Sequence, residues 1–275
     1  VTGAAVPEFA GRKFAIHVTG PSSNRETVIT NTGTLDGEVF LSTGADLLVS
    51  SGTINGRVTM GSGNDAVFNS GTILGDVDLG HHSNLLENTG LIAGGILTGT
   101  TGPNTLRNLG GTIGGDIALG SIANYLHTLV NSGSIGGAVA LSESGSLDVE
   151  NTGEIQGGLV LGGQDDEVRN EGTILGGINL GAGNDKVHNS GLISGGIRAD
   201  ATGIKTVTKQ GGTIEGDLRF TSTFGAYVHN SGEINGTVSA NSGALGLSND
   251  GVLNGSVSAS GGSVNTLNLR NTGLI

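Results

Sequence analysis

The feature that most constrains this chain is a short motif that returns every 19 or 20 residues, with a few slightly longer spacings. The motif is Asn-x-Gly with an aliphatic residue shortly after it, and two units carry Ser50 or Lys209 in place of the Asn. The units start at Asn31, Ser50, Asn69, Asn88, Asn108, Asn131, Asn151, Asn170, Asn189, Lys209, Asn230, Asn249 and Asn271. A fixed internal period of this length is typical of solenoid proteins, in which each repeat packs on the next.

Within each unit the aliphatic residues fall at every second position. In the unit around Asn69 these residues are Val67, Ile73, Val77 and Leu79. Side chains alternate faces with a period of two in a β-strand, whereas a helix requires a period of 3.6, which no segment shows. Glycine recurs between the aliphatic positions and permits tight corners. Each unit is therefore predicted to form three short strands.

One such unit cannot bury its apolar side alone, but stacked units can. Connections between parallel strands are right-handed by strong preference. The sequence therefore predicts an all-β fold, a right-handed parallel β-helix (β-solenoid) of about 12 coils of roughly 19–23 residues. At ~4.8 Å per coil the rod would be about 58 Å long. The repeated Asn is expected to form a ladder of stacked amides.

The two ends of the chain depart from the repeat. Residues 1–26 lack the motif, and Phe9, Phe14, Ile16 and Val18 are predicted to form a cap over the first coil. Residues 27–275 carry the solenoid repeats and stop within a unit, after Asn271. We expect the sequence to be a fragment of a longer protein.

Composition agrees with a repeat and excludes several partners. Gly accounts for 54 of the 275 residues, aromatic residues for only 3%, and Cys is absent. The net charge is −12 and no basic stripe is present, which argues against binding to nucleic acid or anionic membranes. No apolar run approaches the ~20 residues of a membrane-spanning helix, so no membrane insertion is expected in this segment.

Acidic turns provide the candidate metal ligands. Gly61-Ser-Gly-Asn-Asp65 and Gly181-Ala-Gly-Asn-Asp185, with a variant ending at Asp165-Asp166, each resemble one copy of the RTX-type calcium nonapeptide. Calcium prefers several oxygen ligands, so the weak calcium candidates are Asp65, Asp165, Asp166 and Asp185. Asp46 and Asp65 share one position in successive coils, as do Asp166 and Asp185, which would stack like charges ~5 Å apart. The competing interpretation is ordinary turn chemistry, which is favoured.

The same corner carries the residues that a catalytic site would need. Some β-helices are polysaccharide lyases or hydrolases, which need carboxylates on one face. The charged residues of two neighbouring coils are Asp165, Asp166, Glu167, Arg169, Asp185 and Lys186. No long loop walls a cleft around them, so a solvated charged corner is favoured and no catalytic residue is predicted. His81-His82 is interpreted as part of a turn, and His188 and His229 are expected to be exposed.

An outward threonine occurs three residues after the motif start in half of the coils. These are Thr34, Thr53, Thr72, Thr112, Thr173 and Thr213. A flat threonine array would suggest ice binding, but other residues interrupt the column and no second threonine column accompanies it. Threonine is also a good strand residue, so ice binding is a minor alternative.

The units beginning at Asn69 and Asn170 resemble the repeats of bacterial type V secreted proteins, which include autotransporter passenger domains and filamentous-haemagglutinin-like exoproteins. The resemblance covers residues 27–275. It implies a secreted or cell-surface protein on the exterior of the bacterial outer membrane, commonly with a role in adhesion or biofilm.

The functional prediction is a non-catalytic stalk or adhesin segment that presents a rigid rod. Its expected partner is a protein or glycan of a host or neighbouring cell surface, with self-association as a further option. No cofactor is predicted, although calcium stays open. The alternatives are a polysaccharide-active enzyme on a β-helix and a calcium-dependent assembly module.

Overall fold

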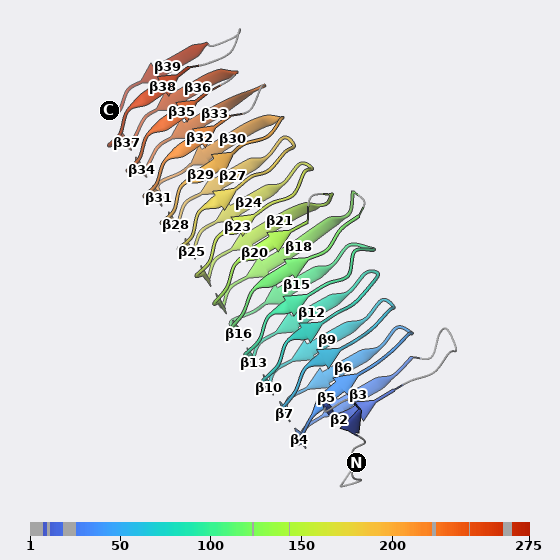
Figure 1. The fold of residues 1–275 in the computed structure, drawn as a ribbon. Coiled ribbons are helices and arrows are strands. Elements are labelled where there is room, and N and C mark those ends of the chain that lie inside the picture. Colours follow the sequence, from blue (N-terminus) through green and yellow to red (C-terminus); the bar gives the residue numbers. More distant parts are fainter. Residues whose placement is uncertain are drawn as a thin grey trace.

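The chain forms an all-β parallel solenoid of about 12 turns, drawn out as a rod with its two ends far apart (Figure 1). The computed structural model describes residues 8–9, 12–18, 26–122, 124–142, 144–221, 224–241, 243–260 and 266–275, and this part of the chain contains no helix. The predicted fold and the three strands per coil are confirmed. The right-handed sense of the coil stays a prediction.

The first sheet has fourteen strands, all parallel except for the antiparallel pair β1 and β2 at one edge. Its strands are β1 (Glu8–Phe9), β2 (Arg12–His17), β5 (Glu38–Phe40), β8 (Val58–Thr59), β11 (Val77–Asp78), β14 (Ile96–Leu97), β17 (Ile117–Leu119), β20 (Val139–Leu141), β23 (Leu159–Val160), β26 (Ile178–Asn179), β29 (Ile197–Ala199), β32 (Leu218–Phe220), β35 (Val238–Ala240) and β38 (Val257–Ala259).

The second sheet has twelve strands of only two residues each, which begin three or four residues after the start of each motif. Its strands are β4 (Thr34–Leu35), β7 (Thr53–Ile54), β10 (Thr72–Ile73), β13 (Leu91–Ile92), β16 (Thr112–Ile113), β19 (Ser134–Ile135), β22 (Glu154–Ile155), β25 (Thr173–Ile174), β28 (Leu192–Ile193), β31 (Thr213–Ile214), β34 (Glu233–Ile234) and β37 (Val252–Leu253).

The third sheet has thirteen longer strands, each ending at the first residue of a motif. Its strands are β3 (Val28–Asn31), β6 (Leu47–Ser50), β9 (Ala66–Asn69), β12 (Leu85–Asn88), β15 (Thr105–Asn108), β18 (Leu126–Asn131), β21 (Ser146–Asn151), β24 (Glu167–Asn170), β27 (Lys186–Asn189), β30 (Ile204–Lys209), β33 (Gly225–Asn230), β36 (Ala244–Asn249) and β39 (Leu267–Asn271).

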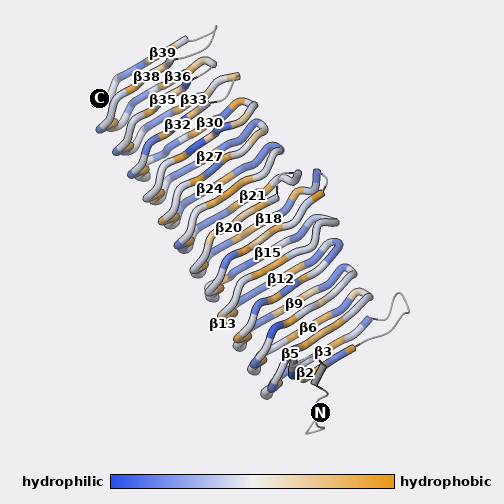
Figure 2. The backbone as a smooth tube through the Cα atoms, viewed as in Figure 1, coloured by the Kyte–Doolittle hydropathy of each residue, from blue (hydrophilic) through white to orange (hydrophobic). Residues whose placement is uncertain are grey.

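The core consists of aliphatic side chains stacked in columns inside the coil. Val67, Ile73 and Val77 come from the three sheets and are completely buried. Each pairs in register with the equivalent residue of the next coil, and the buried cluster continues from Ile29 to Leu253. In Figure 2 apolar and polar stretches follow one another along the coils. Burial of each such side chain contributes about 1.5–3 kcal/mol, so repetition supplies the stability that no single coil has.

Glycine is required where successive backbones approach closely. A Cβ on Gly71 would lie 2.0 Å from the carbonyl oxygen of Gly52, and one on Gly176 would lie 2.4 Å from the backbone nitrogen of Gly158. Gly33 holds the position of Gly71 in the first coil, before which the structure describes no further coil, and a Cβ there would meet nothing within 4 Å. The close stacking of coils, and not only the turn, therefore requires glycine at this position of the motif.

At the N-terminal end, β2 pairs in parallel with β5 and so continues the first sheet. Phe14 is buried, stacks on the His17 ring at a centroid distance of 4.5 Å, and meets Phe40 edge-on at 6.2 Å. Ile16 and Val18 are partly buried and pack against the core, whereas the side chains of β1, including Phe9, lie outside the described residues.

Candidate functional site

The motif asparagines form the predicted ladder inside the coil. Asn88 Nδ2 donates to Asn108 Oδ1 at 2.9 Å, and Asn108 Nδ2 donates to Asn131 Oδ1 at 2.9 Å. The same amide nitrogen of Asn108 also donates to the carbonyl oxygens of Gly111 and Ser134, at 3.0 and 3.2 Å. An amide carries both donors and acceptors, so one residue type can repeat without leaving a buried group unpaired. We assign this column to structure.

A second column of buried polar residues lies four residues before the ladder in eight of the coils, where the turn enters the third sheet. We call it the turn column, and its buried polar members are Asp46, Asp65, Asn84, Asn104, His127, Asp166, Asp185 and Lys205. The side chain of one coil accepts a hydrogen bond from the backbone of the preceding coil. Asp46 N donates to Asp65 Oδ1 at 2.8 Å, and Asp166 N donates to Asp185 Oδ1 at 3.0 Å.

The expectation of a solvated charged corner is therefore wrong for Asp166 and Asp185. Both side chains point into the coil and are 2% and 0% exposed. A signal for this was present in the sequence. Asp185 lies four residues before Asn189, so it shares the inward parity of Val187 and Asn189, and Asp166 stands in the same relation to Asn170.

Three carboxylates of the turn column keep one oxygen without a partner. The Oδ2 atoms of Asp46, Asp65 and Asp166 are buried and accept no hydrogen bond from any residue that the structure describes. The contacts of Asn84 show that turn carbonyls surround this position of the column. Its Nδ2 lies 3.2–3.4 Å from the carbonyl oxygens of Gly80, His81 and His82. A bare carboxylate oxygen beside such carbonyls is repelled unless a proton or a cation lies between them.

Burial shifts the acidity of these groups toward neutral pH. Loss of hydration raises the pKa of Asp65 to about 7 and that of Asp166 to about 8. Burial also raises the pKa of Asp185, to about 6, although the Lys205 ammonium at 2.5 Å opposes the rise. With these pKa values, a proton can occupy the carboxyl groups of Asp65 and Asp166 near neutral pH.

The four calcium candidates do not converge on one point. Asp165 is exposed and its Oδ1 accepts a hydrogen bond from Asn184 N at 2.7 Å, on the opposite side of the backbone from Asp166. Among the described residues, no three Asp, Glu or His side chains gather as metal ligands. A calcium ion in the turn column would instead be held by one or two buried carboxylates, Asp46 with Asp65 or Asp166 with Asp185, and by turn carbonyls. All of these are hard oxygen donors that fit calcium chemically.

The charged corner considered for catalysis is divided by the coil wall. Glu167 and Lys186 are register partners on the outer face, where Arg169 pairs with Glu167 and His188 Nε2 lies 3.6 Å from Glu167. Asp166 and Asp185 face the interior. The carboxylates of this corner therefore do not face one cleft.

The threonine column lies on the outside of the second sheet. Thr34, Thr53 and Thr72 are successive register partners, and Leu91 follows them at the same position. Further along, Ser134, Glu154, Leu192 and Glu233 interrupt the column. Since each strand is two residues long, it offers one outward side chain and no second threonine column. His81, His82 and His229 are exposed, and His188 is partly exposed.

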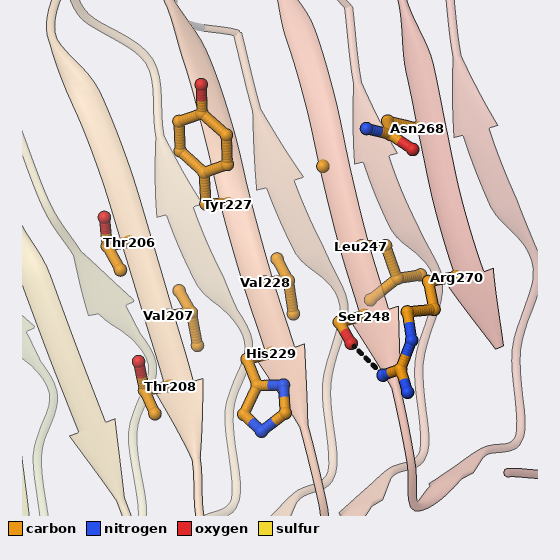
Figure 3. A pocket seen from close by; sticks show the side chains of 11 residues that line it. Thr206, Val207, Thr208, Tyr227, Val228, His229, Leu247, Ser248, Asn268 and Arg270 are labelled. Carbon is orange, nitrogen blue, oxygen red and sulfur yellow. Dashed lines mark hydrogen bonds between the residues drawn. The ribbon is translucent and has the colours of Figure 1, made fainter. Parts of the chain in front are cut away.

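Two open hollows lie on the outer faces of the rod, and the sequence reasoning missed both. One, of about 310 Å³, lies over β30, β33, β36 and β39 beside Tyr227, Gly246 and Arg270 (Figure 3). The other, of about 500 Å³, lies on the first sheet over Gly177 and Gly196. A large aromatic and a glycine at outward strand positions were the available signals for the first.

Comparison with known proteins bears on the fold. The chain is similar to the X-ray crystal structure of a hyperactive, Ca²⁺-dependent, β-helical antifreeze protein from an Antarctic bacterium, with a TM-score of 0.70 and 20% sequence identity. The likeness covers 92% of this chain and 82% of that one. No family model matches the chain, and no curated protein matches it. At this identity the likeness establishes a β-helical fold shared with that protein.

Proposed function

We propose that this chain is a non-catalytic, extracellular stalk or adhesin segment of a bacterial surface protein, which presents a rigid rod for attachment. The observation that carries the proposal is the unbroken stack of three sheets around one core, from Ile29 to Leu253. The spacing of 19–23 residues between motifs leaves no room for long insertions. Among the described residues no helix could span a membrane.

The rod gives this function a simple physical basis. Each interior coil is hydrogen-bonded to both neighbours through three parallel ladders and packs its buried aliphatic residues against theirs, so bending the rod would break many contacts at once. The outward side chains lie outside this core, and some of them pair between coils, as Arg57 does with Asp78. The exposed ones can carry recognition groups while the inward residues keep the rod straight.

The test is binding of the purified chain to a panel of polysaccharides, matrix proteins and whole cells, with the polysaccharides assayed for new chain ends. Saturable binding without new chain ends is expected. New chain ends would overturn the proposal in favour of a polysaccharide-active enzyme. Absence of binding to every surface in the panel would contradict the adhesin role.

A calcium-dependent module is the second candidate, and one observation favours it. The Oδ2 atoms of Asp46, Asp65 and Asp166 are buried without partners, and a bound calcium ion would supply the missing positive charge. We expect calcium to raise the melting temperature at pH 8 over that in chelator, and Asp65→Asn with Asp166→Asn to remove the increase. An Asp165→Asn control should retain it, because Asp165 lies outside the turn column. Equal melting curves with calcium and with chelator would exclude this candidate.

A further inference from the structure

Toward the C-terminal end of the rod, polar side chains and one tyrosine gather on the outer face of the third sheet. There, β30, β33, β36 and β39 bring eight outward residues into a grid of two rows. One row is Thr206, Tyr227, Gly246 and Asn268, and the other is Thr208, His229, Ser248 and Arg270. Neighbours within a row are ~4.8 Å apart. This grid surrounds the 310 Å³ hollow.

Gly246 forms a notch in the first row. Glycine in the middle of a strand weakens it and often marks a place where another group approaches closely. Tyr227 and Asn268 stand on either side, one coil away each, so their Cα atoms are about 10 Å apart. A Cβ on Gly246 would lie 2.9 Å from Cδ1 and 3.3 Å from Cε1 of Tyr227, which places the ring against the edge of the notch.

Tyr227 remains more than half exposed beside the glycine. Its exposed fraction is 56%, in a chain where aromatic residues make up only 3%. Figure 3 shows the ring standing on β33, with its hydroxyl group directed away from His229. An exposed tyrosine beside a glycine offers a flat apolar surface with a polar edge.

The groups around the notch are hydrogen-bonding and close to neutral overall. Asn268, Ser248 and Thr206 offer amide and hydroxyl groups. Arg270 is already engaged, because its Nη1 donates to Ser248 Oγ at 3.3 Å and to Asp250 Oδ1 at 3.1 Å. With Asp250 neutralising Arg270 and a net charge of −12 on the chain, a polyanionic ligand would be disfavoured.

We propose that the Gly246 notch is a binding subsite for one neutral hexopyranose ring of a surface glycan, stacked on Tyr227 and hydrogen-bonded by Asn268 and the Ser248–Arg270 pair. A pyranose has an apolar C–H face and a rim of hydroxyl groups, and the notch provides an aromatic face with a polar rim. This inference names the ligand class of the proposed adhesin and therefore rests on that function.

The fluorescence of Tyr227 can serve as the probe for the test. It contains no Trp and only two Tyr residues, so Tyr125→Phe leaves Tyr227 as the sole tyrosine. In that background, glucose-, galactose- and mannose-containing neutral oligosaccharides are titrated while tyrosine emission is recorded, with an oligouronate as the charged arm. A saturable emission change with at least one neutral sugar is expected, and none with the oligouronate.

Variants identify the site. Tyr227→Ala should weaken binding, measured by saturation-transfer NMR, by roughly two- to tenfold, whereas Tyr227→Phe should retain most of it. Gly246→Val should displace the Tyr227 ring, because a Cβ there would lie 2.9 Å from its Cδ1, and so abolish binding. A melting curve should confirm folding, since valine favours strands. Phe68→Ala, an outward aromatic of the same sheet on β9, is the matched control and should bind like the parent.

The outcomes separate this inference from the function it rests on. Sugar binding that Tyr227→Ala and Gly246→Val leave unchanged would overturn the subsite and leave the adhesin role intact. Binding of proteins only, or preference for the oligouronate, would likewise overturn it. Failure to bind any surface of the earlier panel would contradict the adhesin role itself.

Discussion

Both polar columns inside this rod bury hydrogen-bonding groups, but the Asn ladder pairs these groups more completely than the turn column does. In the Asn ladder, each amide between Asn88 and Asn151 donates to the next coil and accepts from the previous one. In the turn column, Asp46, Asp65 and Asp166 accept one hydrogen bond each and leave a second oxygen unpaired. Both columns are buried to the same degree, so the chemical group rather than the location makes the difference.

The comparison shows what an interior column of repeats requires. A side chain that is both donor and acceptor can be copied from coil to coil indefinitely, whereas a carboxylate has only acceptors and cannot be. Where Lys205 follows Asp185, a cation supplies the donors, and its Nζ also donates to the carbonyl oxygen of Gly183 at 2.6 Å. No cation follows Asp46, Asp65 or Asp166 in the column, and each of these carboxylates keeps one oxygen without a partner among the described residues.

The largest effect is expected when an acidic group is placed in the ladder. Asn131 Nδ2 donates to Asn151 Oδ1 at 2.8 Å and to the carbonyl oxygens of Gly133 and Glu154. Asn131→Asp replaces this donor with an acceptor facing three acceptors, and should lower the free energy of unfolding by about 5 kcal/mol. Asn271→Asp at the exposed end is the control, with an expected change below about 0.5 kcal/mol. Chemical denaturation measures both, and equal effects would contradict the ladder argument.

Breaking the buried ion pair should come next. Lys205→Met leaves the Asp185 carboxylate buried without its cation and should cost about 3 kcal/mol at pH 8. The loss should be smaller at pH 5, because burial already raises the pKa of Asp185 to about 6. Changing both residues together, Asp185→Leu with Lys205→Met, should restore stability, since Leu147, Ala226 and Leu245 occupy the same column. A double variant as unstable as the single one would contradict this account.

Removing the unpaired oxygens should change how stability depends on pH. The pKa values of Asp65 and Asp166 rise from 3.8 to about 7 and about 8 on folding, so the folded chain holds protons that the unfolded chain releases. The free energy of unfolding should therefore fall as pH rises from about 4 to about 8. In chelator, Asp65→Asn and Asp166→Asn should flatten this slope and raise the melting temperature at pH 8. Asp165→Asn should leave the slope as it is.

The smallest effect is a gain from completing the ladder. Ser50 stands where other coils have Asn; its Oγ accepts from Asn31 Nδ2 at 3.1 Å, and Asn69 Oδ1 is left without a partner. Ser50→Asn would supply the missing donor and should stabilise the chain by about 1 kcal/mol. Thermal denaturation checks the change, and a lower melting temperature would show that this coil lacks room for the amide.

Much of the architecture could be read from the residues. The period-two alternation around Asn69 predicted strands, the spacing of 19–20 residues predicted coils, and the repeated amide predicted its own ladder, which Asn108 and Asn131 now show. Each of these depends on a pattern that every copy repeats. The inward orientation of Asp185 also follows from its even spacing from Asn189. The turn before Asp185 made this hard to recognise, because Gly181 and Gly183 adopt positive φ angles of 65° and 97° there.

The sequence by itself determined the repeat, its strand content and the residues that face inward, because alternation along a strand is a local property of the backbone. Only the tertiary structure decided which side chains of different coils become neighbours. Tyr227 leans across Gly246, nineteen positions away, and Asn268 lies on the far side after a longer coil. Coil lengths vary, so the register between coils had to be settled by packing of the shared core. The same packing left the oxygens of Asp65 and Asp166 unpaired, because burial is a property of the stack and not of any one turn.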